Sequence, residues 1–429
     1  MTGGGSERVR IAIVGGGPAG AVLAARLARA GEEVVVLERS PTWRWHAGGV
    51  FASPVAVAAL SRAGLDASTL AEVAKPIPAM RVETQAGVTF RLTYGADVGG
   101  PSAVGFDRSR LDPALLDLAA SSGAEIRRGW HVTALDPDGG RLEARRPDGG
   151  RVVLRAAVVV GADGPHSVVA RSAGVSRSAR LAPRVGLTYH LPDPDPTECR
   201  DARMIVLRDG YVGIAPVAGG RLNVGIVLGR SWRPDLVRDG GRKVADSIVA
   251  GIAPTEDDPA DWRTGDPADR RAGEPADWRT GEPTDWRTGE PTDSVAGAWP
   301  VGHRVTRRAG RGWLLVGDAA GFLDPFTGEG LHRALVSTEL AAAAIMAHTR
   351  GRAGAFDAYE RAMQRRFLAK DVVSSLVQGF LGQPALFEYA ARRVAARPAV
   401  RATMGLVMGD LVPAGRALDP RFLAALLAP

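Results

Sequence analysis

Residues 9–39 read VRIAIVGGGPAGAVLAARLARAGEEVVVLER, and this stretch decides the fold. An apolar run predicts a buried strand over residues 9–14, and GGGPAG at residues 15–20 follows directly with G-x-G-x-x-G spacing. The pattern then predicts a helix over residues 21–30 and a second strand over residues 33–37. A strand, a glycine-rich turn, a helix and a second strand in this order form the βαβ unit that binds dinucleotides.

The residues of this turn have separate roles. Gly15 allows a tight turn, Gly17 leaves room for a pyrophosphate against the backbone, and Gly20 lets helix and strand pack closely. Pro18 and Ala19 belong to the same turn, and the helix after it directs its free N–H groups and positive dipole end at the phosphates.

Glu38 comes 18 residues after Gly20. At that position a carboxylate accepts hydrogen bonds from both ribose hydroxyls and repels a 2′-phosphate. The stretch therefore predicts FAD or NAD rather than NADP. The alternative, a glycine-rich turn in an unrelated α/β protein, is disfavoured because strand, helix, second strand and acid are all present.

Composition narrows the class of protein. The chain has 429 residues, 45% of them hydrophobic, which suits two or more globular domains. No apolar run approaches the roughly 18 residues that define a spanning helix, so we expect no integral membrane segment. The net charge is +7, but the arginines are scattered, so we expect no nucleic-acid partner.

Cysteine and histidine usage points to a reducing compartment without a metal. Cys199 is the only cysteine, and the seven histidines show no metal-ligand spacing, so we expect no metal site. The N-terminal MTGGGSER lacks the apolar region of a signal peptide. We therefore expect a cytoplasmic protein.

A second motif, VVVGADGPHSVVAR, occupies residues 158–171. Its apolar strand leads into a turn with Asp163, and Ser167 begins a helix. Arg108 stands earlier in the chain, at the start of another predicted helix.

A third motif, WLLVGDAAGFLDPFTGEGLHRAL, occupies residues 313–335. A strand leads into Gly317 and Asp318, whose carboxylate suits the hydroxyls of a ribityl chain. Gly328 and Gly330 let the backbone approach a flat ring. The helix that follows would direct its positive end at the flavin edge where negative charge collects on reduction.

In this order and spacing, GxGxxG with Glu38, GADGPHS and GDAAGFLDPFTGEG resemble the FAD-dependent oxidoreductases of the para-hydroxybenzoate hydroxylase fold. The resemblance covers most of residues 8–350. It implies FAD as cofactor and NADH or NADPH as reductant. The cofactor-binding residues that it implies are Gly15, Gly17, Pro18, Ala19, Gly20, Glu38 and Arg39 for the ADP half, Arg108 for the pyrophosphate region, Asp163 for FAD and NAD(P)H, Gly317 and Asp318 for the ribityl chain, and Gly49 with the loop Pro325–Gly330, including Gly328 and Gly330, for the flavin side.

Details of these motifs indicate which branch of this superfamily the chain resembles. Aromatic hydroxylases of this fold usually carry GDAAH and a P-x-G-G-Q-G loop, whereas this chain has Gly321 and FTGEG. These features, with GGV at residues 48–50, resemble the geranylgeranyl reductase branch. Tryptophan halogenases share a GDAAGFxDP-like stretch but require W-x-W-x-I-P and a catalytic lysine. Trp43 and Trp45 form W-x-W, and no I-P follows them.

We expect an α/β fold with a Rossmann-type FAD-binding domain assembled from discontinuous segments, a β-sheet substrate domain and a helical C-terminal part. Strand-like alternation predicts hairpins over residues 80–92 and 211–228. Residues 258–289 repeat an eight-residue unit with Pro and Gly, which predicts a surface loop, with a tryptophan-bearing binding arm as the alternative. The predicted segments are 1–75, 105–172 and 298–350 for FAD binding, 76–104 and 173–253 for the substrate sheet, 254–297 for the repeat loop, and 351–429 for the helical region.

The leading hypothesis is an FAD-dependent monooxygenase that hydroxylates or epoxidises an apolar small molecule through a flavin C4a-hydroperoxide, in bacterial secondary metabolism such as antibiotic biosynthesis. The alternatives are a geranylgeranyl reductase-like reductase or dehydrogenase acting on C–C bonds, a halogenase, and a flavin-binding protein without activity. No catalytic residue is identified. Arg44 and His46 are candidates for contact with flavin or substrate, or plain loop residues. The sequence leaves the oligomeric state open.

Overall fold

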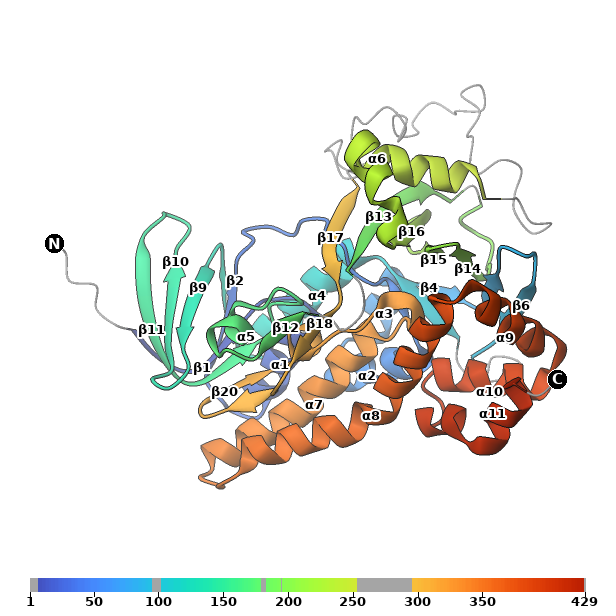
Figure 1. Ribbon diagram of the computed structural model, residues 1–429. Coiled ribbons are helices and arrows are strands. Elements are labelled where there is room, and N and C mark those ends of the chain that lie inside the picture. Colours follow the sequence, from blue (N-terminus) through green and yellow to red (C-terminus); the bar gives the residue numbers. More distant parts are fainter. Residues whose placement is uncertain (1–6, 95–101, 179–182, 194, 253–294, 428–429) are drawn as a thin grey trace.

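The computed structural model describes residues 7–94, 102–178, 183–193, 195–252 and 295–427. The eight-residue repeat lies outside the described residues. Two large sheets and a set of long helices make up the described chain (Figure 1). The predicted α/β fold class is confirmed.

The first sheet contains the strand that leads into the glycine-rich turn of residues 15–20. Its parallel strands run in the order β20, β11, β1, β2, β8, so that the first strand of the chain lies at the centre. Helices α1, α4 and α7 pack together, with α1 between the other two. The elements of this part are β1 (Glu7–Val14), α1 (Pro18–Arg29), β2 (Val34–Glu38), α4 (Arg108–Ser121), β8 (Glu125–Arg128), β9 (His131–Asp136), β10 (Arg141–Arg145), β11 (Arg151–Gly161), α5 (Val168–Ser172), β19 (Ala309–Gly310), β20 (Trp313–Leu315), η4 (Gly317–Ala320), η5 (Pro325–Thr327) and α7 (Gly330–Thr349).

The second sheet has seven strands in the order β17, β13, β16, β15, β14, β5, β6, and all neighbours are antiparallel except β14 and β5. Apolar residues of helix α6 cover part of one face. These elements are β5 (Met80–Glu83), β6 (Thr89–Leu92), β13 (Arg184–Pro192), β14 (Ala202–Leu207), β15 (Gly210–Val217), β16 (Arg221–Leu228), η2 (Arg230–Trp232), α6 (Arg233–Ala250) and β17 (Ala296–Val301).

Small elements connect the two sheets. A three-stranded sheet has the order β3, β7, β4, and β12 pairs with β18. Their bounds are β3 (Phe51–Ala52), α2 (Pro54–Ala63), α3 (Ala67–Val73), β4 (Ala74–Ile77), β7 (Ala103–Phe106), β12 (Ser176–Ser178) and β18 (His303–Val305).

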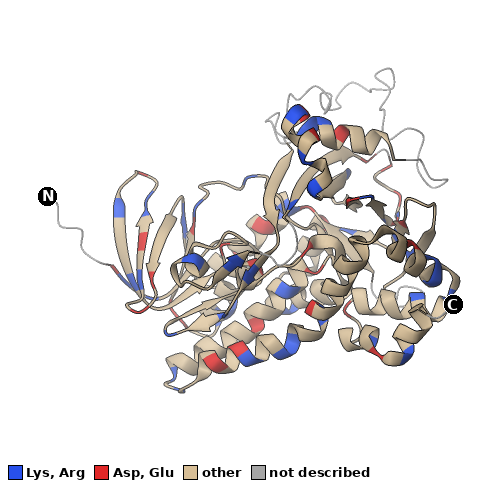
Figure 2. Ribbon diagram, viewed as in Figure 1, with Lys and Arg blue, Asp and Glu red and all other residues tan. Residues whose placement is uncertain are grey.

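The C-terminal part is helical and reaches from one sheet to the other. Helix α8 packs along α7, and α9 and α10 contact β6 of the second sheet (Figure 1). These elements are α8 (Ala355–Leu381), α9 (Pro384–Ala396), α10 (Pro398–Met408), η6 (Ala414–Leu418) and α11 (Pro420–Leu427). Both acidic and basic residues occur along α7 and α8 (Figure 2).

Both predicted hairpins are confirmed as β5–β6 and β15–β16. The helix predicted over residues 21–30 begins earlier, at Pro18, because proline suits a first helical position whose N–H has no intrahelical partner. Strand β17 joins the second sheet from beyond the repeat, and the predicted boundary at residue 298 falls inside it. The domain boundaries themselves stay a prediction. Across the described ranges, no helix is long and apolar enough to cross a membrane.

Candidate functional site

A cavity of about 1800 Å³ extends from the glycine-rich turn after β1 to the C-terminal helices. Its lining comes from the three motif turns, from the second sheet and from α8–α11. The predicted cofactor residues that line it are Gly15, Gly17, Pro18, Ala19, Glu38, Arg39, Gly49, Arg108, Asp163, Gly317, Asp318, Pro325, Gly328 and Gly330. Gly20 is the exception. A side chain there would overlap the Gly15 carbonyl, so its role is close packing.

The turn at the start of α1 has the form of an anion cradle. Gly15 has a φ of +104°, and a Cβ there would lie 2.5 Å from the Ala162 carbonyl oxygen. A Cβ on Gly17 would meet open space, because this backbone faces the cavity. No side chain caps the first N–H groups of α1. The turn therefore fits a phosphate group, which would accept these hydrogen bonds.

Glu38 is held at the edge of the cavity by the backbone. Its carboxylate oxygens accept hydrogen bonds from the Gly16 N–H at 2.7 Å and the Ser40 N–H at 2.8 Å. Each oxygen keeps a lone pair that could accept a hydroxyl. Arg39 beside it is exposed and lines the same cavity.

Arg108 and Asp318 provide charge in the middle of the cavity. The Arg108 guanidinium makes a bidentate pair with Asp112, at 2.7 and 2.9 Å, and donates to the Gly49 carbonyl at 2.8 Å. Burial raises the pKa of Asp318, and Arg108 and Arg333 oppose that shift. No hydrogen bond joins the Asp318 carboxylate to another described residue. A cofactor with hydroxyl donors would satisfy it.

Asp163 is the corresponding acid of the second motif. Its Oδ2 accepts from the Val168 N–H at 2.7 Å, close to the start of α5. Burial raises the pKa of this carboxyl, and Oδ1 has no partner. This oxygen is therefore buried without a hydrogen-bond donor among the described residues.

Residues 324–330, called the flavin loop below because the resemblance assigns them to the flavin, are held in place from the second sheet. Asp324 accepts hydrogen bonds from the Phe326 N–H at 2.9 Å, from the Tyr211 hydroxyl, and from Arg184 at 3.3 Å. Gly328 has a φ of +66°, and a side chain there would overlap the Phe51 ring. Burial raises the pKa of Tyr211 far above its ordinary value, so its hydroxyl stays a donor.

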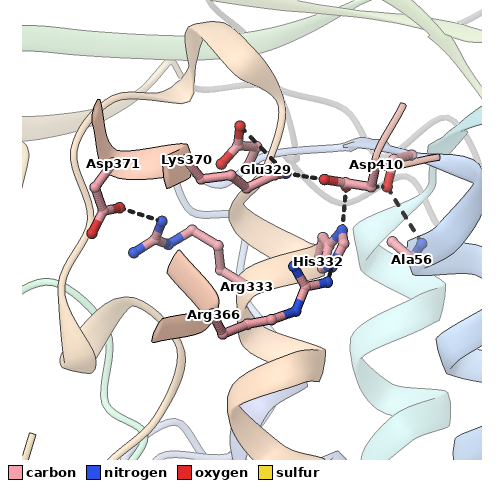
Figure 3. A network of polar contacts seen from close by, with 9 residues as sticks. Ala56, Glu329, His332, Arg333, Arg366, Lys370, Asp371 and Asp410 are labelled. Atoms are coloured by element: carbon pink, nitrogen blue, oxygen red, sulfur yellow. Dashed lines mark hydrogen bonds and ion pairs between the residues drawn. The ribbon is translucent and has the colours of Figure 1, made fainter. Parts of the chain in front are cut away.

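A buried ionic network lies behind this loop (Figure 3). Lys370 Nζ lies 3.4 Å from Glu329 Oε1 and donates to Asp410 Oδ1. The other Asp410 oxygen accepts from His332 Nδ1 and from the Ser53 hydroxyl at 2.7 Å. These residues come from the flavin loop, α8, the end of α10, α7 and the start of α2. The network therefore attaches the C-terminal helices to the flavin loop.

Charged neighbours set the protonation of this network. Arg366 donates to His332 Nε2 at 3.3 Å, so the other ring nitrogen carries the proton given to Asp410. Burial lowers the pKa of His332 to about 3, with Lys370 and Arg366 contributing. Burial also lowers the pKa of Lys370 to about 8, opposed by Glu329. Arg333 pairs separately with Asp371 at 2.6 Å.

The far end of the cavity is an apolar chamber between the second sheet and the C-terminal helices. The chain contributes aromatic and aliphatic side chains from both sides. They are Met80, Val82, Phe90, Leu92, Met204 and Val227 from the sheet, and Val377, Phe380, Phe387, Val394, Met404, Met408, Phe422 and Leu426 from the helices.

The loop after β2 closes one side of the cavity. Trp43, Arg44, Trp45 and His46 all line it, and the Trp45 ring lies 4.4 Å from the His190 ring. Arg44 and His46, the candidates for contact with flavin or substrate, are both exposed on this loop.

Sequence reasoning missed the buried partners of the flavin loop. Tyr211 reads as a core residue on a strand, and Lys370 as one charge on an amphipathic helix. Their partners, Asp324 and Asp410, are 113 and 40 residues away. No local pattern signals pairs at such separations. A lysine at a helical position otherwise taken by buried residues was the one available hint.

Known proteins resemble the chain in both sequence and structure. Residues 8–209 match the family model described as "FAD binding domain". A menaquinone reductase from Mycolicibacterium smegmatis is 29% identical over 355 residues, which cover 79% of this chain and 76% of that protein. A digeranylgeranylglycerophospholipid reductase from Methanoculleus marisnigri is 25% identical over 348 residues, 77% of this chain and 75% of that protein.

A third relative is a 3-amino-4-hydroxybenzoate 2-monooxygenase from Streptomyces cremeus, 33% identical over 228 residues, which cover 50% of this chain and 55% of that protein. Among solved structures, a flavoprotein/dehydrogenase from Cytophaga hutchinsonii superposes with a TM-score of 0.74 at 18% identity, covering 98% of this chain and 95% of that one. The flavin-dependent halogenase CmlS gives 0.68 at 24% identity, covering 93% of this chain and 67% of that one. At these identities the solved structures establish the fold alone.

Proposed function

We propose that this chain, an FAD-dependent oxidoreductase of the para-hydroxybenzoate hydroxylase fold, adds or removes hydrogen across a carbon–carbon double bond. The proposed substrate is extended and apolar. NADH or NADPH is the proposed reductant. A role in secondary metabolism and a cytoplasmic location stay predictions.

The observation that carries this proposal is the continuity of the cavity. One space joins the cofactor turns to a chamber walled by apolar side chains of the second sheet and of α8–α11. A charged substrate would lose its hydration in such a chamber without gaining a partner, whereas an apolar one gains by leaving water. Because this space reaches from the cofactor turns to the C-terminal helices, it suits a molecule that extends away from the cofactor.

The residues of this chain fit FAD. The cradle at Gly17, the carboxylate of Glu38 and the unpartnered carboxylate of Asp318 would hold its phosphates and hydroxyls. When bound, FAD supplies hydride transfer, and the protein supplies position and surroundings. Helix α7 starts at Gly330 with its positive end at the cavity, which stabilises negative charge there.

Two observations favour the reductase hypothesis over the monooxygenase hypothesis. The FTGEG loop and Gly321 already resemble the reductase branch. The two reductases above also align over about three-quarters of both chains, whereas the aminohydroxybenzoate monooxygenase aligns over half of this one. The monooxygenase stays the second candidate, favoured by the greater identity of that shorter alignment and by the apolar chamber, which would exclude water.

A halogenase is less well supported. The halogenase resemblance requires a catalytic lysine, and none of Lys75, Lys243 and Lys370 lines the cavity. Lys370 is instead buried in the network behind the flavin loop.

An anaerobic single-turnover experiment separates these reactions. The FAD-loaded protein is reduced with dithionite and mixed with geranylgeraniol, or with its fully saturated counterpart as the matched control. The reductase proposal predicts that the unsaturated alcohol alone restores the visible absorbance of the oxidised flavin, and that it gains two hydrogens for each flavin oxidised, as measured by mass spectrometry. Product that forms only with oxygen, and that contains an added oxygen atom, would instead establish the monooxygenase.

A further inference from the structure

One face of helix α8 carries a row of exposed apolar side chains. Leu368, Val372 and Leu376 are 59%, 40% and 43% exposed, and they follow one another at four-residue intervals. Side chains spaced in this way lie on one face of a helix. Leu368 and Val372 do not line the cavity, so their exposure is to the outside of the described chain. Water therefore meets an apolar helix face here, which is unfavourable.

Exposed apolar side chains concentrate in this part of the chain. Of the eight large ones that the described residues leave exposed, six lie within residues 368–427. Besides the three on α8, they are Leu386 on α9, Leu411 after α10 and Leu427 on α11. Single exposed apolar residues are ordinary, whereas a concentration of them marks an interaction surface.

Basic residues accompany these apolar side chains. Arg361 and Arg365 precede Leu368 by seven and three residues, so they lie on the same face of α8. Within residues 361–427, the exposed charged side chains are all arginines. They are Arg361, Arg365, Arg366, Arg392, Arg416 and Arg421.

The four acidic residues of the same range are less exposed, and each has a partner. Asp371 pairs with Arg333, and Glu388 accepts a hydrogen bond from the Thr84 hydroxyl at 2.7 Å. Asp410 belongs to the network behind the flavin loop, and Asp419 accepts from the backbone N–H that follows Pro420, at 2.8 Å. The exposed charge of the C-terminal helices is therefore positive and complements an anionic surface.

The apolar row leads to the cavity. Leu376 lies one turn after Val372 and is part of the cavity lining, as are Val373 and Phe380 of the same helix. Leu427 of α11 also lines the cavity and is 43% exposed. An apolar molecule that enters beside Leu376 would move from one apolar surface to another rather than through water.

A second copy of this chain fits the face poorly. A copy seated on the row would cover Leu376, where the row meets the cavity. In a two-fold dimer the same patch faces itself, so the arginines of the two copies would also be brought together. A lipid surface with anionic headgroups has neither disadvantage, because apolar side chains enter the acyl boundary while arginines contact phosphate groups.

We propose that the α8 face, defined by Arg361, Arg365, Leu368, Val372 and Leu376, docks onto an anionic lipid surface, and that the apolar substrate enters the cavity from there. The entry of the substrate rests on the proposed function, whereas the docking itself does not.

Flotation with lipid vesicles tests the docking. The full, FAD-loaded chain is titrated with vesicles of phosphatidylcholine and phosphatidylglycerol in equal amounts, or of phosphatidylcholine alone, and the protein in the floated fraction is measured. The apolar variant is Leu368→Gln with Val372→Gln. The basic variant is Arg361→Gln with Arg365→Gln.

Helix α6 supplies the matched controls. Val237 is 79% exposed there, so Val237→Gln controls for the loss of an exposed apolar side chain. Arg233 and Lys243 are exposed on the same helix, so Arg233→Gln with Lys243→Gln controls for the loss of two positive charges. Flavin content after gel filtration verifies that every variant is folded.

The wild type and both α6 controls should bind the mixed vesicles alike, and bind the neutral ones more weakly. The basic variant should bind the mixed vesicles about 30-fold more weakly, because each arginine near an anionic surface contributes about 5-fold. The apolar variant should bind both kinds of vesicle about 10-fold more weakly, since apolar contact does not depend on headgroup charge.

Three results would overturn the docking: a wild type that binds neither vesicle, α8 variants that bind as the wild type does, or equal losses in the α6 controls. Light scattering without vesicles supplies a fourth. A wild-type dimer that becomes a monomer in the apolar variant would assign the α8 face to a second copy. Detergent-dispersed geranylgeraniol reaches the reduced protein without a vesicle, so flavin oxidation by this alcohol in a protein that binds no vesicles contradicts the docking alone.

Discussion

Replacing Lys370 with methionine tests whether the network behind the flavin loop stabilises the protein by charge compensation. Lys370 is 4% exposed, and it is the cation that contacts both Glu329 and Asp410. Methionine fills much of the same space but leaves two buried carboxylates close together. Removing one partner of a buried pair costs about 3–5 kcal/mol, so we expect a loss of that size in the free energy of unfolding.

The loss should also depend on pH. In Lys370→Met, two buried carboxylates repel each other, and a proton bound by either one relieves that repulsion in the folded state. The folded variant then binds protons more tightly than the unfolded chain, so its stability rises as pH falls. The difference from wild type should therefore be larger near about pH 8 than near about pH 5.

Urea unfolding of the FAD-loaded protein, followed by tryptophan fluorescence and by flavin absorbance, measures the effect. The matched control is Asp371→Asn, which breaks the neighbouring pair with Arg333. That pair is partly exposed, with side-chain exposures of 13% and 32%, so its loss should cost less than about 1 kcal/mol. Equal losses in the two variants, or a Lys370→Met loss independent of pH, would refute the compensation argument.

Three other substitutions have defined outcomes. His332 is neutral when folded, with a pKa of about 3, so acid should destabilise the wild type by about 2 kcal/mol between about pH 6.5 and 5, and His332→Gln should lose that dependence in urea titrations. Gly328→Ala should reduce the flavin retained per protein after gel filtration, because its φ of +66° and a phenylalanine ring exclude a side chain. Gly379→Ala, which meets open space, should retain it. Tyr211→Phe leaves Asp324 without its buried donor and should cost about 1–3 kcal/mol of stability; an unchanged urea midpoint would contradict this.

The nucleotide-binding half of the fold was predictable because its signals are local. The glycine spacing after β1 needs only neighbouring residues to be recognised. In the structure Gly15 has a positive φ, and a Cβ on Gly17 would meet open space. The strands of the second sheet were also visible, since alternation and paired glycines at residues 219–220 mark a hairpin without reference to the rest of the chain.

The wall of the cavity was not predictable in the same way. Helices α8–α11 read as amphipathic, but periodicity states only that one face is buried, not against what. The pairing of Lys370 with Asp410 depends on how α10 ends against α7, which is tertiary information. Tyr94 shows the same limit, because the burial of its hydroxyl without a partner among the described residues is a property of the assembled fold.

The residues proposed to hold the cofactor and the residues that line the apolar chamber occupy different parts of the chain. This separation affects how related enzymes can diversify. The residues proposed to hold FAD all precede residue 331, whereas the helical wall of the chamber comes from residues after 372. Substitutions in that wall can alter the shape available to a substrate without touching the cofactor turns. Asp410 is the exception, because it also anchors the flavin loop through Lys370. We therefore expect exchange of C-terminal segments among relatives to succeed where this lysine–aspartate pair is inherited together, and flavin content after each exchange measures that dependence.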